Sequence, residues 1–546
     1  MTDSPRKAST ASKITPPDDT QFSLFGDVLS ISKAPRVKTA CSSGRRFVTG
    51  NAEAIFIGPT RLKDYLKQAG QKTPFIVADL LDRQDWSSFE ERYAAVGRAP
   101  YAPRAMLGLV LMGVMQGMHS LRELERLARL DLGCMWVTGG ITPDHANIGR
   151  FIDLHEESIT NEFFESFTRS ILKATGSGSN RLAGDGTVIE AACSHYNLLK
   201  AEAIKQKIAE AQKDRDENSG DGESQTQLDK QVVEIYQQRE LARKRSGSST
   251  DTLSISPTEP EAMVQRLKRG KGLAASYKPS VLANEDRIIT AMEVDPSSET
   301  KPIGAMMDQS ARVIGGHAQE LLLDAGYFDD RVIAATLERD VSLLCPDGQT
   351  PGKPKASKVY PKSSFHYDPS TDTYLCPAGA VLKFVKHYPA TPHKREHQLY
   401  GTKACGTCAS RADCTSTKNR RIVRHAEDEQ RDALREVMQQ RQVRAIFAKR
   451  QAMVEPVFSH MRGQQGLHRF RRRGLKAVKR EFALHVLAYN MSRAVALFRA
   501  LFCVPRTSLS ALLARFSRSA QFPKRFFKQS WLPRNSTGLN ALSARN

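Results

Sequence analysis

Apolar residues recur at helical spacing through the first third of the chain. One run repeats every three or four residues, as the buried face of an amphipathic helix does. Its members are Leu107, Val110, Leu111, Val114 and Met118. The pattern predicts a mostly helical N-terminal domain over residues 45–175.

Local sequence signals mark three helix starts within this domain. Pro103 suits the first turn of a helix, where its missing N–H would have no partner anyway. Ser120 and Glu123 have the spacing of a capping box, which predicts a second helix from this point. In Thr142–His145, a third helix is expected to start with Pro143 at its first position. Short helices in a basic protein suit a helix-turn-helix DNA reader, and an ordinary helical packing domain fits the pattern equally well.

The hydrophobic period changes after residue 175, where short apolar runs replace the helical repeat. These runs predict strands at 182–192, 276–282, 287–294, 319–324 and 341–345, with a helix at 328–339. Pro279 lacks an N–H group, which should confine its strand to a sheet edge or a bulge. Residues 176–502 are therefore expected to form an α/β domain, a sheet core with helices around it.

Two segments interrupt this predicted domain, and two flank the whole. Residues 196–260 are strongly charged and predict an inserted helical hairpin followed by a linker. Residues 346–424, rich in Lys, Pro, Tyr and Cys, form a second insertion. Residues 1–44 have no hydrophobic signal core and predict a disordered leader of a cytoplasmic protein. Residues 503–546 form a tail in which cations alternate with aromatic side chains.

The chain is strongly basic. It holds 81 Lys and Arg against 59 Asp and Glu in 546 residues, a formal net charge of +22. Such a balance most often indicates a nucleic-acid partner, less often an anionic membrane, and otherwise serves only solubility. No apolar run is long enough to span a membrane, so no membrane partner is expected. The densest cations, expected to contact a DNA backbone, are Arg469, Arg471, Arg472, Arg473 and Lys476.

Three carboxylates have a local context that suits metal-dependent phosphodiester chemistry. Asp185 and Asp324 each end a short apolar run, as carboxylates at strand ends do, and Glu455 precedes the basic segment. Three such groups can hold two Mg²⁺ ions, which activate the attacking oxygen and stabilise the leaving one. Taken singly, each also fits a turn, a helix cap or a solvent-facing charge. Spacing alone does not rank them above Asp308 or Glu190.

Four cysteines of the second insertion predict a structural zinc site: Cys376, Cys405, Cys408 and Cys414. The two-residue gap between Cys405 and Cys408 lets both sulfurs face one metal, and four thiolates satisfy tetrahedral zinc. His387, His393 and His397 are substitutes for any cysteine that is not a ligand. The irregular spacing leaves reduced thiols in a surface insertion as the alternative.

The chain resembles the bacterial insertion-sequence DDE transposases, in the branch with a helical N-terminal domain ahead of an RNase H-like catalytic domain. The resemblance covers most of residues 50–500. It is carried by four stretches in order: Tyr101–Phe151, Gly184–Ala191, Leu323–Tyr327 and Val454–Asn490. It implies an RNase H-like mixed sheet in the catalytic domain and a DNA-binding role for the helical domain. Related transposases carry similar cysteine clusters at this place.

The resemblance also implies the site residues and the partners. Asp185, Asp324 and Glu455 would be the catalytic ligands of Mg²⁺ or Mn²⁺. The substrate would be double-stranded DNA, both element ends and target, with a homodimer holding two ends in the synaptic complex. The implied function is binding of terminal inverted repeats, followed by metal-dependent strand cleavage and transfer. A metal-dependent nuclease without strand transfer and an inactive, transposase-derived DNA-binding protein are the alternatives.

The chain departs from the family pattern around Glu455. Where the family often has Tyr, Arg and Lys, this chain has Ala448, Gln451 and Arg462. Arg450 can supply the missing guanidinium from a neighbouring position, and Arg462 can still hold a phosphate, with planar geometry. Both arginines are expected to contact DNA.

Overall fold

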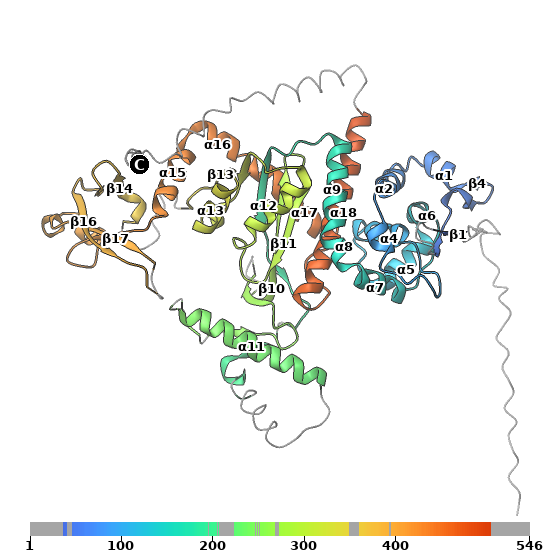
Figure 1. Cartoon of the computed structure of the whole chain (residues 1–546), viewed down its shortest axis with the longest axis horizontal. Coiled ribbons are helices and arrows are strands. Elements are labelled where there is room, and N and C mark those ends of the chain that lie inside the picture. Colours follow the sequence, from blue (N-terminus) through green and yellow to red (C-terminus); the bar gives the residue numbers. More distant parts are fainter. Residues whose placement is uncertain are drawn as a thin grey trace, which may run out of the picture.

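The computed structural model describes residues 37–40, 46–194, 196–204, 206, 223–245, 247, 249–250, 252–267, 272–348, 360–391 and 395–503 (Figure 1). The predictions for the tail, for most of the leader and for much of the first helix of the charged insertion lie outside these residues. Within the predicted leader, β1 (Val37–Ala40) pairs antiparallel with β2 (Arg46–Thr49). Within the described part of the chain, no helix is both long and apolar enough to cross a membrane.

The N-terminal region is helical, as predicted. After a short 3-10 turn (η1, Ala52–Ala54) and the hairpin of β3 (Phe56–Ile57) and β4 (Thr60–Arg61), nine helices follow. They are α1 (Leu62–Gln68), α2 (Thr73–Asp82), α3 (Ser87–Glu90), α4 (Pro103–Met115), α5 (Leu121–Leu130), α6 (Leu132–Thr138), α7 (His145–Leu154), α8 (Glu156–Thr160) and α9 (Glu162–Thr175).

Two of the three predicted helix starts are confirmed and one is wrong. Pro103 is the first residue of α4, and Ser120 with Glu123 closes a capping box on α5. Helix α7 instead begins at His145, and Pro143 lies outside it. The cap is Asp144, whose carboxylate accepts a hydrogen bond from the Asn147 N–H at 2.7 Å. A carboxylate that satisfies an otherwise unpaired N–H sets the helix start more strongly than the fixed φ of a nearby proline.

The α/β prediction is confirmed by a mixed sheet. Its main path has the strand order β11-β10-β5-β12-β13. Strands β11, β10 and β5 are antiparallel neighbours, whereas β12 and β13 run parallel to β5. The strands on this path are β5 (Arg181–Gly186), β10 (Leu273–Asn284), β11 (Ile289–Asp295), β12 (Glu320–Leu322) and β13 (Ser342–Leu344).

The placement of Pro279 was predicted wrongly. Strand β10 is interior, because β11 pairs along one side and β5, β6 (Ile189–Glu190) and β9 (Met263–Arg266) pair along the other. Pro279 stays paired with Val294 of β11. On its other side it lies between the stretches of β10 paired with β5 and with β6, where Thr187 and Val188 separate the two partner strands. There the Pro279 carbonyl accepts from the Thr187 N–H at 3.0 Å. A gap in the ladder tolerates a proline as well as a sheet edge does.

Alternate residues of the central strands enter two different cores. Leu182, Leu282 and Leu321 pack with α12 (Ile303–Ile314) and α13 (Asp330–Glu338) on one face of the sheet. Ala183 and Leu322 face the other way, into the larger core shared with α9, α17 (Arg450–Gly463) and α18 (Leu475–Cys503). This period of two is what a sheet covered on both faces requires.

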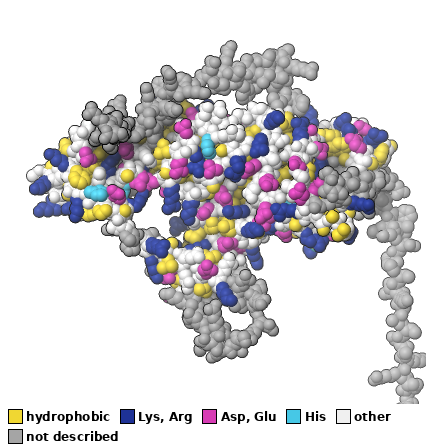
Figure 2. All heavy atoms as spheres, in the orientation of Figure 1, with side chains coloured by type: hydrophobic (Ala, Val, Ile, Leu, Met, Phe, Trp, Pro, Cys, Tyr) yellow, Lys and Arg dark blue, Asp and Glu magenta, His cyan; other side chains and the backbone are white. Residues whose placement is uncertain are grey.

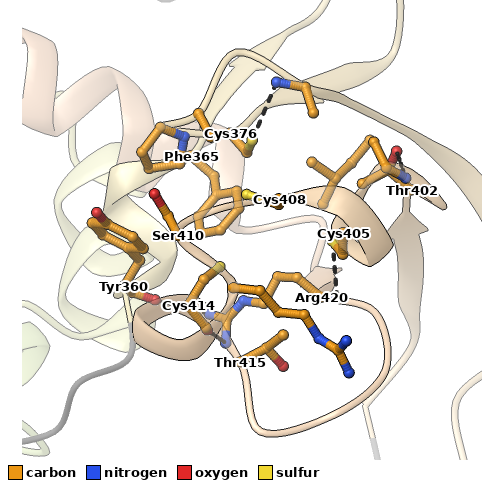
Figure 3. A pocket seen from close by; sticks show the side chains of 16 residues that line it. Tyr360, Phe365, Cys376, Thr402, Cys405, Cys408, Ser410, Cys414, Thr415 and Arg420 are labelled. Atoms are coloured by element: carbon orange, nitrogen blue, oxygen red, sulfur yellow. Dashed lines mark hydrogen bonds between the residues drawn. The ribbon is translucent and has the colours of Figure 1, made fainter.

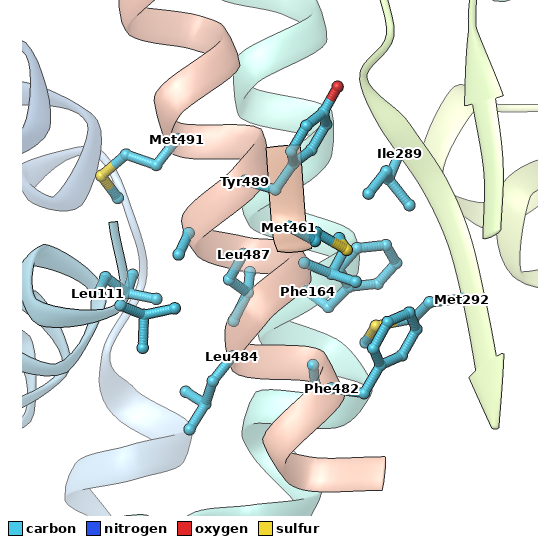
Figure 4. Close-up of a cluster of buried hydrophobic side chains, with 14 of the residues drawn as sticks. Leu111, Phe164, Ile289, Met292, Met461, Phe482, Leu484, Leu487, Tyr489 and Met491 are labelled. Carbon is cyan, nitrogen blue, oxygen red and sulfur yellow. The ribbon is translucent and has the colours of Figure 1, made fainter. Parts of the chain in front are cut away.

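Helix α18 lies between the N-terminal helices and the sheet (Figure 4). Every residue from Glu481 to Met491 is buried. Leu484 and Met491 point toward the N-terminal helices, where Leu111 lies, and Phe482 points toward Met292 of β11. This part of α18 is therefore buried on all sides, as a helix inside a large core is.

The two insertions leave the sheet as separate small units. The first contains β7 (Leu199–Lys200), α11 (Glu223–Arg245) and β8 (Ser254–Ile255). The second is a five-stranded antiparallel sheet with the order β14-β15-β16-β17-β18. Its strands are β14 (His366–Asp368), β15 (Thr373–Leu375), β16 (Val381–Tyr388), β17 (His397–Gly401) and β18 (Arg421–Arg424). Helices α15 (Asp428–Gln439) and α16 (Arg441–Phe447) then lead back to α17.

Candidate active site

Asp185 and Asp324 occupy equivalent positions on neighbouring parallel strands. Ala183 of β5 is paired with Leu322 of β12, and each aspartate lies two residues further along. Two residues restore the same face of a strand, so both carboxylates belong to the face that packs against α17. The carboxyl ends of parallel strands meet at one edge of a sheet, where ligands of such folds commonly bind.

Glycines on both sides of Asp185 are required by close packing. A Cβ on Gly184 would lie 2.4 Å from Leu323 Cδ2 and 2.9 Å from Leu282 Cδ2. A Cβ on Gly186 would lie 2.7 Å from the Cγ of Glu299. The Gly-Asp-Gly sequence therefore lets the neighbouring strand and the Glu299 side chain approach the backbone at the aspartate.

Arg450, the first residue of α17, lies between the two aspartates. Its Nη2 is 3.0 Å from Asp185 Oδ1 and 3.7 Å from Asp324 Oδ2, and it also donates to the Gly184 carbonyl at 3.0 Å. The residue is only 8% exposed. Among the residues that the structure describes, its Nε finds no hydrogen-bond partner. Arg450, expected to contact DNA, is in this structure a buried counter-cation of the aspartates.

Asp324 is held by its own backbone turn. It caps the 3-10 turn η3 (Ala325–Tyr327), and its Oδ1 accepts from the Gly326 N–H at 2.9 Å. Oδ2 is therefore the oxygen that faces Arg450. The backbone carbonyl of Asp324 accepts from the buried Cys345 thiol at 3.0 Å, and burial followed by the charge of Asp324 raises the pKa of this thiol.

Glu455 lies on α17, two turns before Arg462. Residues seven apart share one face of a helix, and Arg462 reaches the end of β5, where it donates to Thr187 Oγ1 and to the Val188 carbonyl. Glu455 is therefore on the same side of α17 as Arg462. Its side chain is exposed, and its Oε2 accepts from the Gln451 amide at 3.0 Å.

Pro456, directly after Glu455, fixes the position of α17 on the sheet. A proline inside a helix has no N–H to donate to the carbonyl four residues earlier, here that of Ala452. Nε of Arg287 donates to this carbonyl at 3.1 Å. Arg287 comes from the turn between β10 and β11 and has a positive φ of 63°. The carbonyl that the proline leaves without its helical donor thus becomes a link between the helix of Glu455 and the sheet.

The donor set at this edge of the sheet fits a divalent cation in type and charge. Mg²⁺ prefers carboxylate oxygens and keeps several waters. Asp185 and Asp324 already converge on one positive group, the Arg450 guanidinium. In the described ranges, no three His, Cys, Asp or Glu side chains form a group that could hold a metal ion as they stand.

Two residues near the aspartates were not singled out by the sequence. Glu299 follows β11, and its Oε1 lies 3.8 Å from Lys278 Nζ. The Tyr327 phenol is buried nearby, where burial, and then the charges of Glu299, Asp185 and Asp324, raise its pKa. No motif marks Glu299, because only the close approach of its side chain to Gly186 brings it to this edge.

The basic segment that contains Arg469 and Arg471–Arg473 is a loop rather than part of a helix, since α18 begins only at Leu475. Arg469 donates to the Ala191 carbonyl at 2.9 Å and to the Cys193 carbonyl, and Arg473 donates to the Ala192 carbonyl at 3.3 Å. The loop is therefore bonded along the backbone that follows β6.

Acidic side chains hold the rest of this loop. Arg472 pairs with Asp153 at 3.4 Å. Lys476, in the first turn of α18, lies 3.8 Å from Glu156. The Lys476 side chain is still 81% exposed, and Arg471 is exposed as well. Of the five cations that the sequence singled out, all but Arg472 are exposed, and on the face shown in Figure 2 cations and acids are interspersed.

The four cysteines of the second insertion line one small cavity of about 30 Å³ (Figure 3). Backbone N–H groups point at two of the sulfurs: Ala380 donates to Cys376 at 3.2 Å and Arg420 to Cys405 at 3.4 Å. Burial raises the pKa of Cys414, and the other three thiols add to this rise. All four are free cysteines.

The histidines named as substitute ligands are not part of this cavity. His387 bonds Glu396 Oε1 at 2.7 Å, and His397 stacks on Tyr388. His393 lies outside the described residues. The sulfur atoms are therefore the donors that this cavity offers to a metal.

Two parts of the chain match known family models. Residues 375–495 match the family model described as transposase DDE domain, which includes the cysteine cavity, Arg450, Glu455 and most of α18. Residues 69–154 match the family model described as transposase domain (DUF772), a range that contains α2 through α7. No curated protein matches the chain.

Proposed function

The chain belongs to the insertion-sequence DDE transposases, and on this basis we propose that it cleaves the ends of its element and joins them to target DNA. The observation that carries the proposal is the convergence of Asp185 and Asp324 on one point at the carboxyl ends of β5 and β12. The mixed sheet, covered by helices on both faces, supports the RNase H-like assignment of residues 176–502.

The positions of the side chains support the catalytic roles that we propose. Asp185 and Asp324 are the two rigid ligands, because one is in a strand and the other caps a turn directly after one. Glu455 is the third, carried by a helix that Arg287 links to the sheet. Mg²⁺ or Mn²⁺ bound to the three carboxylates would activate the attacking oxygen and stabilise the leaving oxygen of the phosphodiester.

Arg462 lies next to the strand end and can position a phosphate there. Its guanidinium contacts Thr187 and Val188, immediately after Asp185. A planar guanidinium can hold two oxygens of one phosphate at a fixed orientation. We assign Arg462 to the scissile strand, in place of the lysine that the family often carries here.

We place DNA-end recognition on the N-terminal helices. Helix α5 presents an exposed stripe of arginines at helical spacing: Arg122, Arg126 and Arg129. Arg129 also pairs with Glu125 at 2.6 Å, one turn before it. Cations in a row along a helix match the spacing of backbone phosphates and give affinity that falls with salt. The sequence offered this signal, since these residues recur at every third or fourth position.

We propose zinc for the cysteine cavity. Four thiolates around a space of about 30 Å³, two of them already accepting backbone N–H bonds, suit a tetrahedral structural site. The core of this unit is small, centred on Tyr374, Leu382 and Tyr400. A bound metal would stabilise a sheet too small to be stable through its own core.

Cleavage and joining of labelled element ends test the proposed function. Wild-type protein should cut and join in Mg²⁺, and Asp185→Asn, Asp324→Asn and Glu455→Gln should each lose at least about 1000-fold while still binding end DNA. Lys449→Gln, an exposed change next to α17, is the control. Wild-type activity in the carboxylate variants would refute the assignment. Cutting without joining would instead favour a nuclease, and end binding without any cutting would favour the DNA-binding alternative.

A further inference from the structure

One buried arginine pairs with two candidate metal ligands, and this pairing affects how a metal ion enters the site. The Nη2 atom of Arg450 lies within ion-pair distance of both Asp185 and Asp324. That single nitrogen is at the point on which the two carboxylates converge. We propose that Arg450 is a built-in counter-cation that neutralises the aspartates before metal binds and must be displaced for metal to enter.

Charge favours such a group between the two aspartates. Two carboxylates facing one point repel each other, and a cation between them removes most of this repulsion. Asp185 is largely shielded from water, with a side chain that is 21% exposed, so solvent alone screens it poorly. A divalent ion at the same point would repel the guanidinium and take over both carboxylates.

One feature of its surroundings lowers the cost of moving Arg450 out of its buried position when a competing cation binds. Its Nε has no hydrogen-bond partner among the described residues, and a buried donor without a partner is costly. Arg450 is the first residue of α17, so its side chain can turn outward without breaking the helix. The displaced guanidinium would then be free to contact a DNA phosphate, which is the role predicted for it from sequence.

This inference rests on the proposed metal site, and Mn²⁺ binding to the full-length protein without DNA tests both. Mn²⁺ affinity is measured for the wild type, Arg450→Gln, Arg450→Lys and Asp185→Asn. Removing the competing charge should tighten binding by about tenfold or more in R450Q, since a unit charge at this distance contributes several times RT. R450K keeps the charge and should stay near the wild type. Lys449→Gln removes an exposed neighbouring cation, 60% exposed at its side chain, and should change affinity less than twofold.

The outcomes separate the two proposals. Mn²⁺ binding that D185N leaves unchanged would overturn the metal site itself. Binding that depends on Asp185 but is unchanged or weakened in R450Q would overturn only the role of Arg450.

A second measurement uses the wild-type protein and needs no variant to fold. Arginine modification by phenylglyoxal, read by mass spectrometry, should spare Arg450 in EDTA, where it is buried, and should reach it in saturating Mn²⁺. Arg444, which is exposed on α16, should be modified equally in both conditions. An Arg450 that stays protected when Mn²⁺ is bound would show that it is not displaced, and would refute the proposal.

Discussion

The side chain of Asn490 joins three elements of the core, and its loss should loosen the edge of the sheet. Its Oδ1 accepts from the Ile289 N–H at 2.9 Å, and its Nδ2 donates to the Ile289 carbonyl at 2.9 Å and to Thr168 Oγ1 at 3.2 Å. Strand β11 is an edge strand, and Asn490 supplies the hydrogen bonds that another strand would make. The predicted change is Asn490→Leu, which keeps the branched shape of the side chain and removes all three bonds.

The expected loss of stability follows from the groups that the leucine would leave without a hydrogen-bond partner. The N–H and the C=O of Ile289 would stay buried without this partner, at about 1–3 kcal/mol each. Burying a leucine in place of an amide would stabilise the folded protein by about 1–2 kcal/mol. The net loss should be about 3 kcal/mol, or about 100-fold in the opening equilibrium of β11.

Hydrogen exchange of peptides covering β11 measures this opening directly. Protection of residues 287–295 should fall about 100-fold in Asn490→Leu. Ser492→Ala is the matched control on the same helix, because its hydroxyl bonds only the Ala488 carbonyl of α18 itself at 2.9 Å. Protection within about threefold of the wild type in Asn490→Leu would show that the amide contributes no net stability to this edge.

Three further predictions concern packing, pH and metal. Gly184→Ala should lower the free energy of unfolding in urea by about 1–3 kcal/mol, because its Cβ would overlap Leu323. The control Gly178→Ala, whose Cβ would lie in open space, should leave this free energy unchanged. Burial lowers the pKa of His485 to about 3 and of His155 to about 4. Both are neutral when folded and charge more readily when unfolded, so the free energy of unfolding should fall by about 1 kcal/mol for each as pH drops from 7.5 to 5.5. Stability that does not change over this range would contradict their burial. Chelation of zinc, or replacement of the four cysteines by serine, should raise hydrogen exchange in residues 360–424 and leave β5 unchanged; a purified protein without zinc would refute the site.

The aspartates could be predicted from sequence because their positions depend on local rules. Each follows a short apolar run, and the strand period of two then places Asp185 and Asp324 on one face. The Glu455 assignment needed the family resemblance, since a lone helical Glu is usually a surface charge. The cysteines were found by spacing, and the structure gathers all four at one cavity.

Other features depend on contacts between distant segments and were out of reach of the sequence. Arg450 was expected at a surface, because arginine is seldom buried without a partner, and its partners lie more than a hundred residues away. Pro279 was excluded from an interior strand, because the two-residue gap between β5 and β6 is invisible in the sequence. Glu299 has no motif at all.

The burial of α18 on all sides also has a consequence during synthesis, because the helices that it covers are made first. Helices α4 and α9 pack directly against α18, yet α18 follows them by about 300 residues. At roughly 5–20 residues per second, the ribosome needs about 15–60 s to reach it. During that interval the N-terminal helices carry an apolar face with nothing to cover it. We therefore expect the nascent chain to be prone to aggregation until α18 emerges.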